Sequence, residues 1–149
     1  RIILALRHPA DVLLSCFVSN FRPNASMANF LRLDTAAEFY DLSFSYWTKA
    51  RDLLRPDVHE VRYEQMVSDP EGELRPLVEW LGLPWREELL DHRKTASERG
   101  LISTASYAQV REPIYTRSAG RWQRYRAELA PVLPVLQPWV DRLGYRMQP

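Results

Sequence analysis

The chain has 149 residues, 46% of them hydrophobic and 26% charged, and a formal net charge of +1. This composition is typical of one globular domain with a real core, and it gives no reason to expect a nucleic-acid-binding protein. No apolar run approaches the roughly 18 residues of a membrane span, and no secretory signal is visible. A single cysteine, Cys16, cannot form an internal disulfide, which favours a reducing compartment such as the cytoplasm.

The first predicted element is a strand over residues 2–6, an apolar run that ends at Arg7. A continuous apolar run is typical of a strand buried on both faces of a parallel sheet. Such a strand needs neighbours on both sides, so we expect part of the sheet to lie upstream of Arg1.

A helix is predicted to begin near Pro9, because proline is favoured at the first helical position. Residues 22–26 then form a loop. The apolar stripe of this helix is expected to comprise Val12, Leu13, Cys16 and Phe17.

A long helix is predicted over residues 35–54, because Thr35-Ala36-Ala37-Glu38 has the pattern of a capping box. A second strand follows over residues 58–63. Asp69 and Pro70 have the pattern of a helix start, and Gly82 of its stop. The expected buried side of the long helix comprises Phe39, Tyr40, Phe44, Trp47 and Leu54, and that of the later helix Leu74, Leu77, Val78 and Leu81.

Residues 92–118 lack periodicity and are predicted to be irregular, which in a compact domain favours a functional loop. The end of the chain is helical again, but Pro134 and Pro138 predict a late start, a kink or a break there. The order of elements predicts an α/β fold with few strands and many helices.

Arg7 is the first candidate for a binding site, because it lies between the end of a buried strand and the start of a helix. Ligands of open α/β sheets bind at this edge, and a helix N-terminus with free N–H groups suits a phosphate. Ser15, about a turn and a half into the helix, would donate to the same anion. The simpler interpretation pairs Arg7 with Asp11 and places Ser15 against the core, and spacing alone favours it.

Two other segments carry candidate residues. Tyr63 ends the second strand, on the same sheet edge as Arg7 if the strands are parallel, where it would contact an adenine or be an ordinary half-buried tyrosine. The stretches 103–110 and 113–122 together combine hydroxyls, two arginines and a glycine, which suits a loop over a polyanion. A surface loop with a helix cap at Ser118 explains it equally well. His8, His59 and His92 show no metal-ligand spacing, and there is no glycine-rich P-loop.

Taken in order, these segments resemble the sulfotransferase superfamily. The resemblance is closer to its bacterial members, which are often joined to TPR repeats and are related to tyrosylprotein sulfotransferases. Residues 2–15 are similar to the 3′-phosphate strand–helix motif of the family. Residues 62–70 with 81–85, and residues 106–122, match two later motifs, of which 113–122 is the most specific.

The resemblance implies the helix-rich C-terminal portion of a P-loop-NTPase-like α/β fold with a parallel sheet. It implies PAPS (3′-phosphoadenosine-5′-phosphosulfate) as co-substrate, PAP as its desulfated product, and no metal for the transfer. The residues that it implies in nucleotide binding are Arg7 and Ser15 at the 3′-phosphate, Tyr63 and Ser106 near the adenosine, and Arg121 with its neighbour Arg117 at the phosphates.

In the family, the 5′-phosphosulfate loop, the lysine that steadies the sulfuryl group and the catalytic base precede this motif, and no segment here matches them. We therefore expect residues 1–149 to be the C-terminal part of a single sulfotransferase domain, unable to catalyse alone. The expected partners are the nucleotide, an unidentified acceptor hydroxyl or amine bordered by residues 22–29, and upstream TPR repeats. A second copy is also expected, because exposed sheet edges favour self-association.

Two other hypotheses stay open at this point. In the first, the chain is a non-catalytic helical module whose aromatic helices bind a partner protein. In the second, it is a fragment of a P-loop-like phosphotransferase. Titration with PAP separates the first from a sulfotransferase, and a preference for ATP over PAP would indicate the second.

Overall fold

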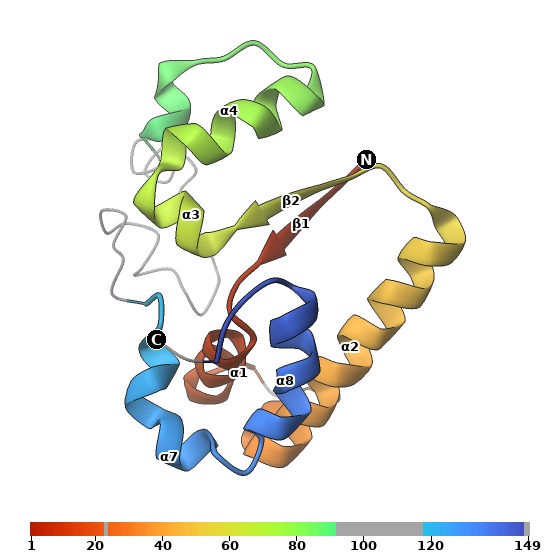
Figure 1. Cartoon of the computed structure of the whole chain (residues 1–149), viewed down its shortest axis with the longest axis vertical. Coiled ribbons are helices and arrows are strands. Elements are labelled where there is room, and N and C mark those ends of the chain that lie inside the picture. The colour runs from red at the N-terminus through yellow and green to blue at the C-terminus, as the bar shows by residue number, and fades with distance from the viewer. Residues whose placement is uncertain (23, 92–117, 148–149) are drawn as a thin grey trace. The chain divides into compact units, whose positions relative to one another are not determined.

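The computed structural model describes residues 1–22, 24–91 and 118–147, and Figure 1 labels their helices and strands. The chain divides into two compact units. The first comprises Arg1–Leu6 and Val58–Arg117, and the second Arg7–Asp57 and Ser118–Pro149. Each unit is therefore assembled from segments that are far apart in the sequence. The single domain predicted over residues 1–149 stays a prediction.

The first unit contains a parallel pair of strands, β1 (Ile2–Leu6) and β2 (Val58–Arg62). Their register runs from Ile2 opposite Val58 to Leu6 opposite Arg62. Both strand predictions are confirmed, although β2 ends one residue early because Tyr63 begins the short helix α3 (Tyr63–Ser68). The parallel order on which the placement of Tyr63 depended is therefore present.

The predicted burial of β1 on both faces is wrong, because Ile2, Ile3 and Ala5 are exposed. Ile2 and Ile3 are 39% and 49% exposed, and only Leu6 is fully buried, at 2%. The described sheet has two strands, so β1 has one neighbouring strand, and helices α3 and α4 of the same unit pack on β2. An apolar run thus predicted the strand correctly but not how much of it is covered.

Helix α4 (Pro70–Leu81) begins and ends as its sequence predicts. The carboxylate of Asp69 accepts a hydrogen bond of 3.0 Å from the N–H of Gly72, and Pro70 occupies the first turn. Gly82 ends the helix with φ 74°, a left-handed conformation that glycine adopts without steric cost. A short 3₁₀ helix, η2 (Glu87–Leu90), follows.

Side chains of α4 fasten this helix to β2. Glu73 Oε1 accepts a hydrogen bond of 2.7 Å from the N–H of Arg62, and Val78 is buried. The ring of Trp80 lies 5.3 Å from that of His59 on the strand. Of the four apolar residues predicted to be buried in α4, only Val78 is fully buried, and Glu73 and Trp80 supply the other contacts with β2.

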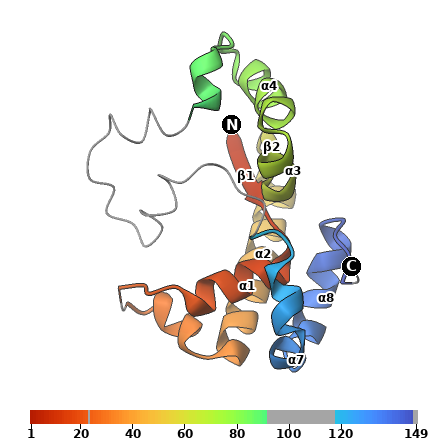
Figure 2. The same cartoon turned by 90° about the vertical axis from the view of Figure 1, so that its left-hand side faces the viewer.

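The second unit is built from helices. They are α1 (Pro9–Val18), the 3₁₀ helix η1 (Met27–Leu31), α2 (Leu33–Leu54), the 3₁₀ helix η3 (Arg121–Tyr125), α7 (Arg126–Leu129) and α8 (Leu133–Arg142). Helix α1 packs on α2, α8 and η3, and α2 packs on α8 (Figure 2). Their core comprises Ala10, Leu13, Leu14, Ala36, Ala37, Tyr40, Trp122, Leu129, Val132, Leu136 and Trp139.

The buried face of α1 is rotated from the one predicted. Leu13 is buried as expected, but Phe17 is 38% exposed and Cys16 is only partly buried, whereas Asp11 is 1% exposed. Apolar spacing could not predict this face, because the polar Asp11 side chain is buried by hydrogen bonds to a distant segment.

Helix α2 begins two residues before the predicted capping box, at Leu33. The Thr35 hydroxyl instead donates to the carbonyl of Asn29 at 2.7 Å, so the predicted capping box is wrong. The helix ends at Leu54 as predicted, but the Leu54 side chain is 73% exposed. The buried residues of α2 all lie in its N-terminal half, against α1 and α8: Ala36, Ala37 and Tyr40.

The end of the chain breaks where its prolines predict a break. Helix α7 stops at Leu129 and α8 begins at Leu133, with Pro134 in the first turn of α8 and Pro138 inside it. Proline is tolerated in the first turn because that turn has no N–H to donate within the helix. In the described residues, no helix combines the length and apolar character needed to cross a membrane.

These elements confirm a helix-rich α/β chain with a small parallel sheet.

The core of the second unit depends on α8, which offers a matched test. Leu136 is fully buried, and the adjacent Val135 is 37% exposed. We expect Leu136→Ala to lower the free energy of unfolding by about 2–5 kcal/mol, because it leaves a cavity. Val135→Ala should change it by less than about 1 kcal/mol. Urea unfolding followed by circular dichroism measures both, and equal effects would contradict this core.

Candidate functional site

The candidate site begins where β1 passes into α1. Only Arg7 and His8 separate the last residue of β1 from Pro9, the first residue of α1. Ser15 follows about a turn and a half into the helix and is partly buried. The predicted placement of Arg7, between a strand end and a helix start, is confirmed.

The free N–H groups expected at the start of α1 are absent, because His8 accepts from them. Its carbonyl accepts from the N–H groups of Asp11 and Val12 at 2.9 and 3.0 Å, and its ring Nδ1 accepts from Ala10 at 3.2 Å. Pro9 has no N–H. An anion at this helix would therefore bind side-chain donors and the positive end of the helix dipole, and not the main chain.

Arg7 contacts a segment from the other end of the chain. Its Nη2 donates to the carbonyl of Ser118 at 2.5 Å. Burial raises the pKa of the Cys16 thiol, and the positive charge of Arg7 partly offsets that rise. The charge of Arg7 thus acts on the turn of α1 that holds Cys16 and the adjacent Ser15.

Asp11, which the simpler interpretation paired with Arg7, bonds the main chain of the same late segment. Its Oδ2 accepts from the N–H of Gly120 at 2.7 Å, and its Oδ1 accepts from the N–H of Trp122 at 2.8 Å. These bonds span 109 and 111 positions of the sequence. The site therefore joins the start of α1 to residues 118–122.

Arg121 lies between the two N–H groups that Asp11 accepts. Gly120 turns the chain with φ 69°, and Arg121 begins η3. The side chain of Arg121 is partly buried, and its guanidinium carbon lies 5.9 Å from the centre of the Tyr125 ring. The hydrogen bonds of Asp11 therefore attach the segment of Arg121 to α1, the helix that follows Arg7 and contains Ser15. A phosphate site shared by these residues would require such an attachment.

His8 and Trp122 reinforce this junction, and the sequence analysis assigned a role to neither. Their rings stack with centres 4.9 Å apart and planes 13° from parallel, and the Tyr145 ring meets His8 edge-on at 5.5 Å. His8 Nδ1 accepts a hydrogen bond, so Nε2 carries the proton and donates to the Arg146 carbonyl at 3.0 Å. The one sequence signal for His8 was its place directly before a helix-opening proline.

Of the other predicted nucleotide binders, Tyr63 is the one that the structure describes. Tyr63 belongs to the first unit, where it is partly buried at the start of α3. It follows Arg62, which is opposite Leu6 in the register, just as Arg7 follows Leu6. Ser106 and Arg117 lie outside the described residues. The roles of all the predicted site residues stay predictions.

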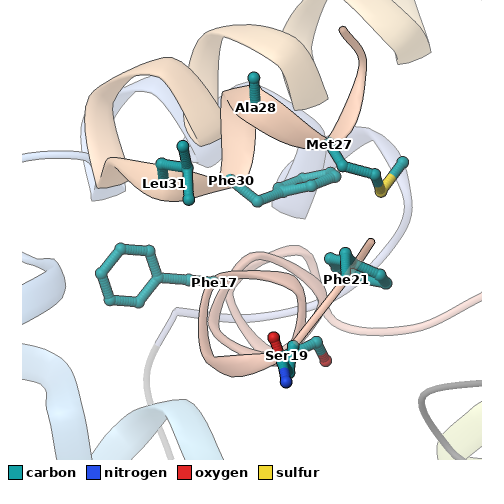
Figure 3. A pocket seen from close by; sticks show the side chains of 8 residues that line it. Phe17, Ser19, Phe21, Met27, Ala28, Phe30 and Leu31 are labelled. Carbon is teal, nitrogen blue, oxygen red and sulfur yellow. The ribbon is translucent and has the colours of Figure 1, made fainter. Parts of the chain in front are cut away.

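A separate cavity of about 140 Å³ lies between the end of α1 and η1 (Figure 3). Its lining is largely apolar, and the rings of Phe21 and Phe30 lie 5.6 Å apart across it. Residues 22–29, predicted to border the acceptor, contribute Met27 and Ala28 to this lining. The prediction that an acceptor binds nearby stays a prediction.

Among the described residues, no three histidine, cysteine or acidic side chains are grouped so as to hold a metal ion. The donors at the α1 junction are guanidinium, hydroxyl and imidazole groups. Guanidinium and hydroxyl groups bind phosphate oxygens well. The chemistry of this junction therefore suits an anion.

Comparison with known proteins gives a consistent picture. A model of the sulfotransferase family matches residues 1–87. An uncharacterised protein of Aquifex aeolicus is 30% identical over 147 residues, which are 96% of this chain and 18% of that protein. Protein-tyrosine sulfotransferase 1 of Danio rerio is 30% identical over 57% of this chain and 25% of the enzyme. Protein-tyrosine sulfotransferase A of Caenorhabditis elegans is 30% identical over 58% of this chain and 23% of that enzyme.

The chain thus spans a quarter or less of the length of these relatives. The matched residues 1–87 include Arg7, which follows β1, Ser15 in α1, and Tyr63 at the start of α3. The chain belongs to the sulfotransferase family.

Proposed function

We propose that this chain forms the 3′-phosphate and adenosine side of a PAPS site. The parent sulfotransferase would transfer a sulfuryl group from PAPS to an acceptor hydroxyl or amine. The observation that carries the proposal is the junction at the start of α1. There Arg7 and Asp11 both bond residues 118–122, so that two arginines from distant parts of the chain belong to one junction.

In this proposal Arg7 and Ser15 bind the 3′-phosphate. Because His8 accepts from the first N–H groups of α1, the affinity would come from the guanidinium fork and the serine hydroxyl. Arg121 adds a second positive charge to the same phosphates. Electrostatic attraction of this kind is strong for a dianion that is partly removed from water.

Tyr63 and Ser106 would contact the adenosine, and Arg117 would lie near the phosphates. The support for Tyr63 is the parallel register, which places it one residue after the partner of Leu6. For the fold, we propose the P-loop-NTPase-like parallel sheet implied by the family, of which β1 and β2 form two strands.

The acceptor is the least specified part of this function. The names of the zebrafish and nematode relatives specify protein tyrosine, so a tyrosine-containing peptide is the first acceptor to test with the parent protein. No segment of this chain matches the 5′-phosphosulfate loop or the catalytic base of the family. We therefore assign binding, and no catalytic residue, to residues 1–149, and a measurable sulfation rate by this chain alone would refute that assignment.

A non-catalytic interaction module is the second candidate, and one observation favours it. The later part of α2 exposes large apolar side chains, with Leu42 at 65%, Tyr46 at 75% and Leu53 at 81% exposure. These three residues lie on one helical face by their spacing. Such a face suits a protein partner, but it predicts no response to nucleotides, so PAP titration separates the two candidates.

Loss of either arginine should weaken binding of PAP. We expect Arg7→Ala and Arg121→Ala each to lower PAP affinity at least about tenfold, since each removes a charge-assisted hydrogen bond to phosphate. Affinity for AMP, which lacks the 3′-phosphate, should fall less in Arg7→Ala. Isothermal titration calorimetry measures both ligands.

Arg124 supplies the matched control for these variants. It lies in η3 with Arg121 but is exposed, so Arg124→Ala should bind PAP as the unsubstituted chain does. Equal losses in Arg121→Ala and Arg124→Ala would indicate only a general effect of positive charge. A preference of the unsubstituted chain for ATP over PAP would instead favour a phosphotransferase.

Cys16 offers a second measurement, because it is the only cysteine in the chain. Burial raises the pKa of Cys16 and Arg7 partly offsets that rise, so binding of PAP should raise the pKa further, since the phosphate would counter the Arg7 charge. Arg7→Met should raise this pKa without ligand and remove its response to PAP, whereas Arg7→Lys should preserve both properties. The pH dependence of thiol alkylation measures the pKa, because the thiolate is the reactive form. An unchanged pKa in Arg7→Met would contradict the placement of Arg7.

A further inference from the structure

Asp11 is a buried carboxylate. In the part of the chain that the structure describes, its side chain accepts hydrogen bonds from the main chain of a segment that is distant in the sequence. Its side chain is 1% exposed, and it accepts from Gly120 at 2.7 Å and from Trp122 at 2.8 Å. Burial of a charge is costly unless hydrogen bonds compensate it. Its place in the first turn of α1 adds the favourable helix dipole. An apolar residue would fill a core position without this cost, so the carboxylate calls for a specific explanation.

The two accepted N–H groups flank a single residue, Arg121. A hydrogen bond on each side fixes the main chain of that residue relative to α1. Gly120 contributes by its left-handed conformation, with φ 69°, which turns the chain into η3. Arg121 is partly buried, and its guanidinium carbon lies 5.9 Å from the centre of the Tyr125 ring. The hydrogen bonds of Asp11 thus fix the position of the Arg121 Cα relative to α1.

The same short segment is also attached at both of its ends. Ser118 accepts from Arg7, and the Trp122 ring stacks on His8, which itself caps α1. The segment 118–122 is therefore attached to the residues on both sides of the strand–helix boundary. Among these attachments, only those of Asp11 act on the main chain directly beside Arg121.

We propose that Asp11 is a positioning residue of the nucleotide site, which holds Arg121 where it and Arg7 bind the same 3′-phosphate. The proposal rests on the proposed function, because it gives that site a residue that touches no ligand. It explains why a charged side chain lies on the buried face of α1. It also explains why the carboxylate bonds the main chain of residues 120 and 122.

A double-mutant cycle tests this proposal, with PAP and AMP as the ligands. Asp11→Asn preserves the shape of the side chain but turns an amide N–H₂ towards one of the two donors. We expect Asp11→Asn to lower PAP affinity about tenfold and AMP affinity less. In an Arg121→Ala background, the same change should alter PAP affinity less than about twofold, because Asp11 acts through Arg121.

Asp41→Asn is the matched control for loss of a structural carboxylate. Asp41 accepts a hydrogen bond of 2.7 Å from Trp139 Nε1 and so joins α2 to α8, away from residues 118–122. It should leave the ratio of PAP to AMP affinity unchanged. Thermal unfolding of each variant shows whether a loss of affinity merely follows a loss of fold.

Gly120→Ala tests the same hydrogen bonds from the other side and serves if Asp11→Asn does not fold. An added Cβ would contact only the Gln123 side chain, at 3.7 Å, but φ 69° is strained for alanine. Gly82→Ala carries a similar strain, at φ 74°, in the first unit. We expect Gly120→Ala, but not Gly82→Ala, to lower PAP affinity selectively.

The outcomes separate this inference from the function on which it rests. If the unsubstituted chain binds PAP no better than AMP, the proposed function is wrong. If it prefers PAP, and folded Asp11→Asn retains that preference, the positioning role is wrong while the function stands. Additive losses from Asp11→Asn and Arg121→Ala would also overturn the positioning role, since they would show that Asp11 does not act through Arg121.

Discussion

A buried carboxylate joins the two chain segments of the second unit. Asp11 accepts from Gly120 and Trp122, more than a hundred positions away, and each bond is charge-assisted. Loss of one partner in such a contact would leave the other polar group buried and unsatisfied. Asp11 is therefore one of the main links between η3 and α1, and the link closest to Arg121 along the chain. The stacking of His8 on Trp122 adds an apolar contact to the same junction.

The start of α1 differs from the usual anion site at a helix N-terminus. In that arrangement unsatisfied N–H groups point at the anion. Here the N–H groups of Ala10, Asp11 and Val12 all donate to His8. The main chain of this turn is thus satisfied without a ligand, which fixes the helix before any anion binds. Burial raises the pKa of Cys16 on the same helix, and the positive charge of Arg7 partly offsets that rise.

Local patterns predicted the elements well wherever the determining contacts are local. The two strands, the proline start of α1, the Asp69 cap and Gly82 stop of α4, and the break before α8 depend on residues a few positions apart, and all are confirmed. The capping box at Thr35 is wrong because its hydroxyl donates to Asn29, in the preceding 3₁₀ helix. The buried face of α1 was missed for a similar reason, since the partners of Asp11 are remote in sequence.

For the site, the sequence by itself determined the family, the strand–helix boundary at Arg7, and the segments that carry Ser15, Tyr63 and Arg121. These follow from residue order and short spacing. Only the tertiary structure decided that Asp11 accepts hydrogen bonds from residues 120 and 122, and that His8 both caps α1 and stacks on Trp122. The physical reason is that a buried charge forms hydrogen bonds, and a buried ring packs, with whichever groups the fold brings near it. No local pattern records which groups those are.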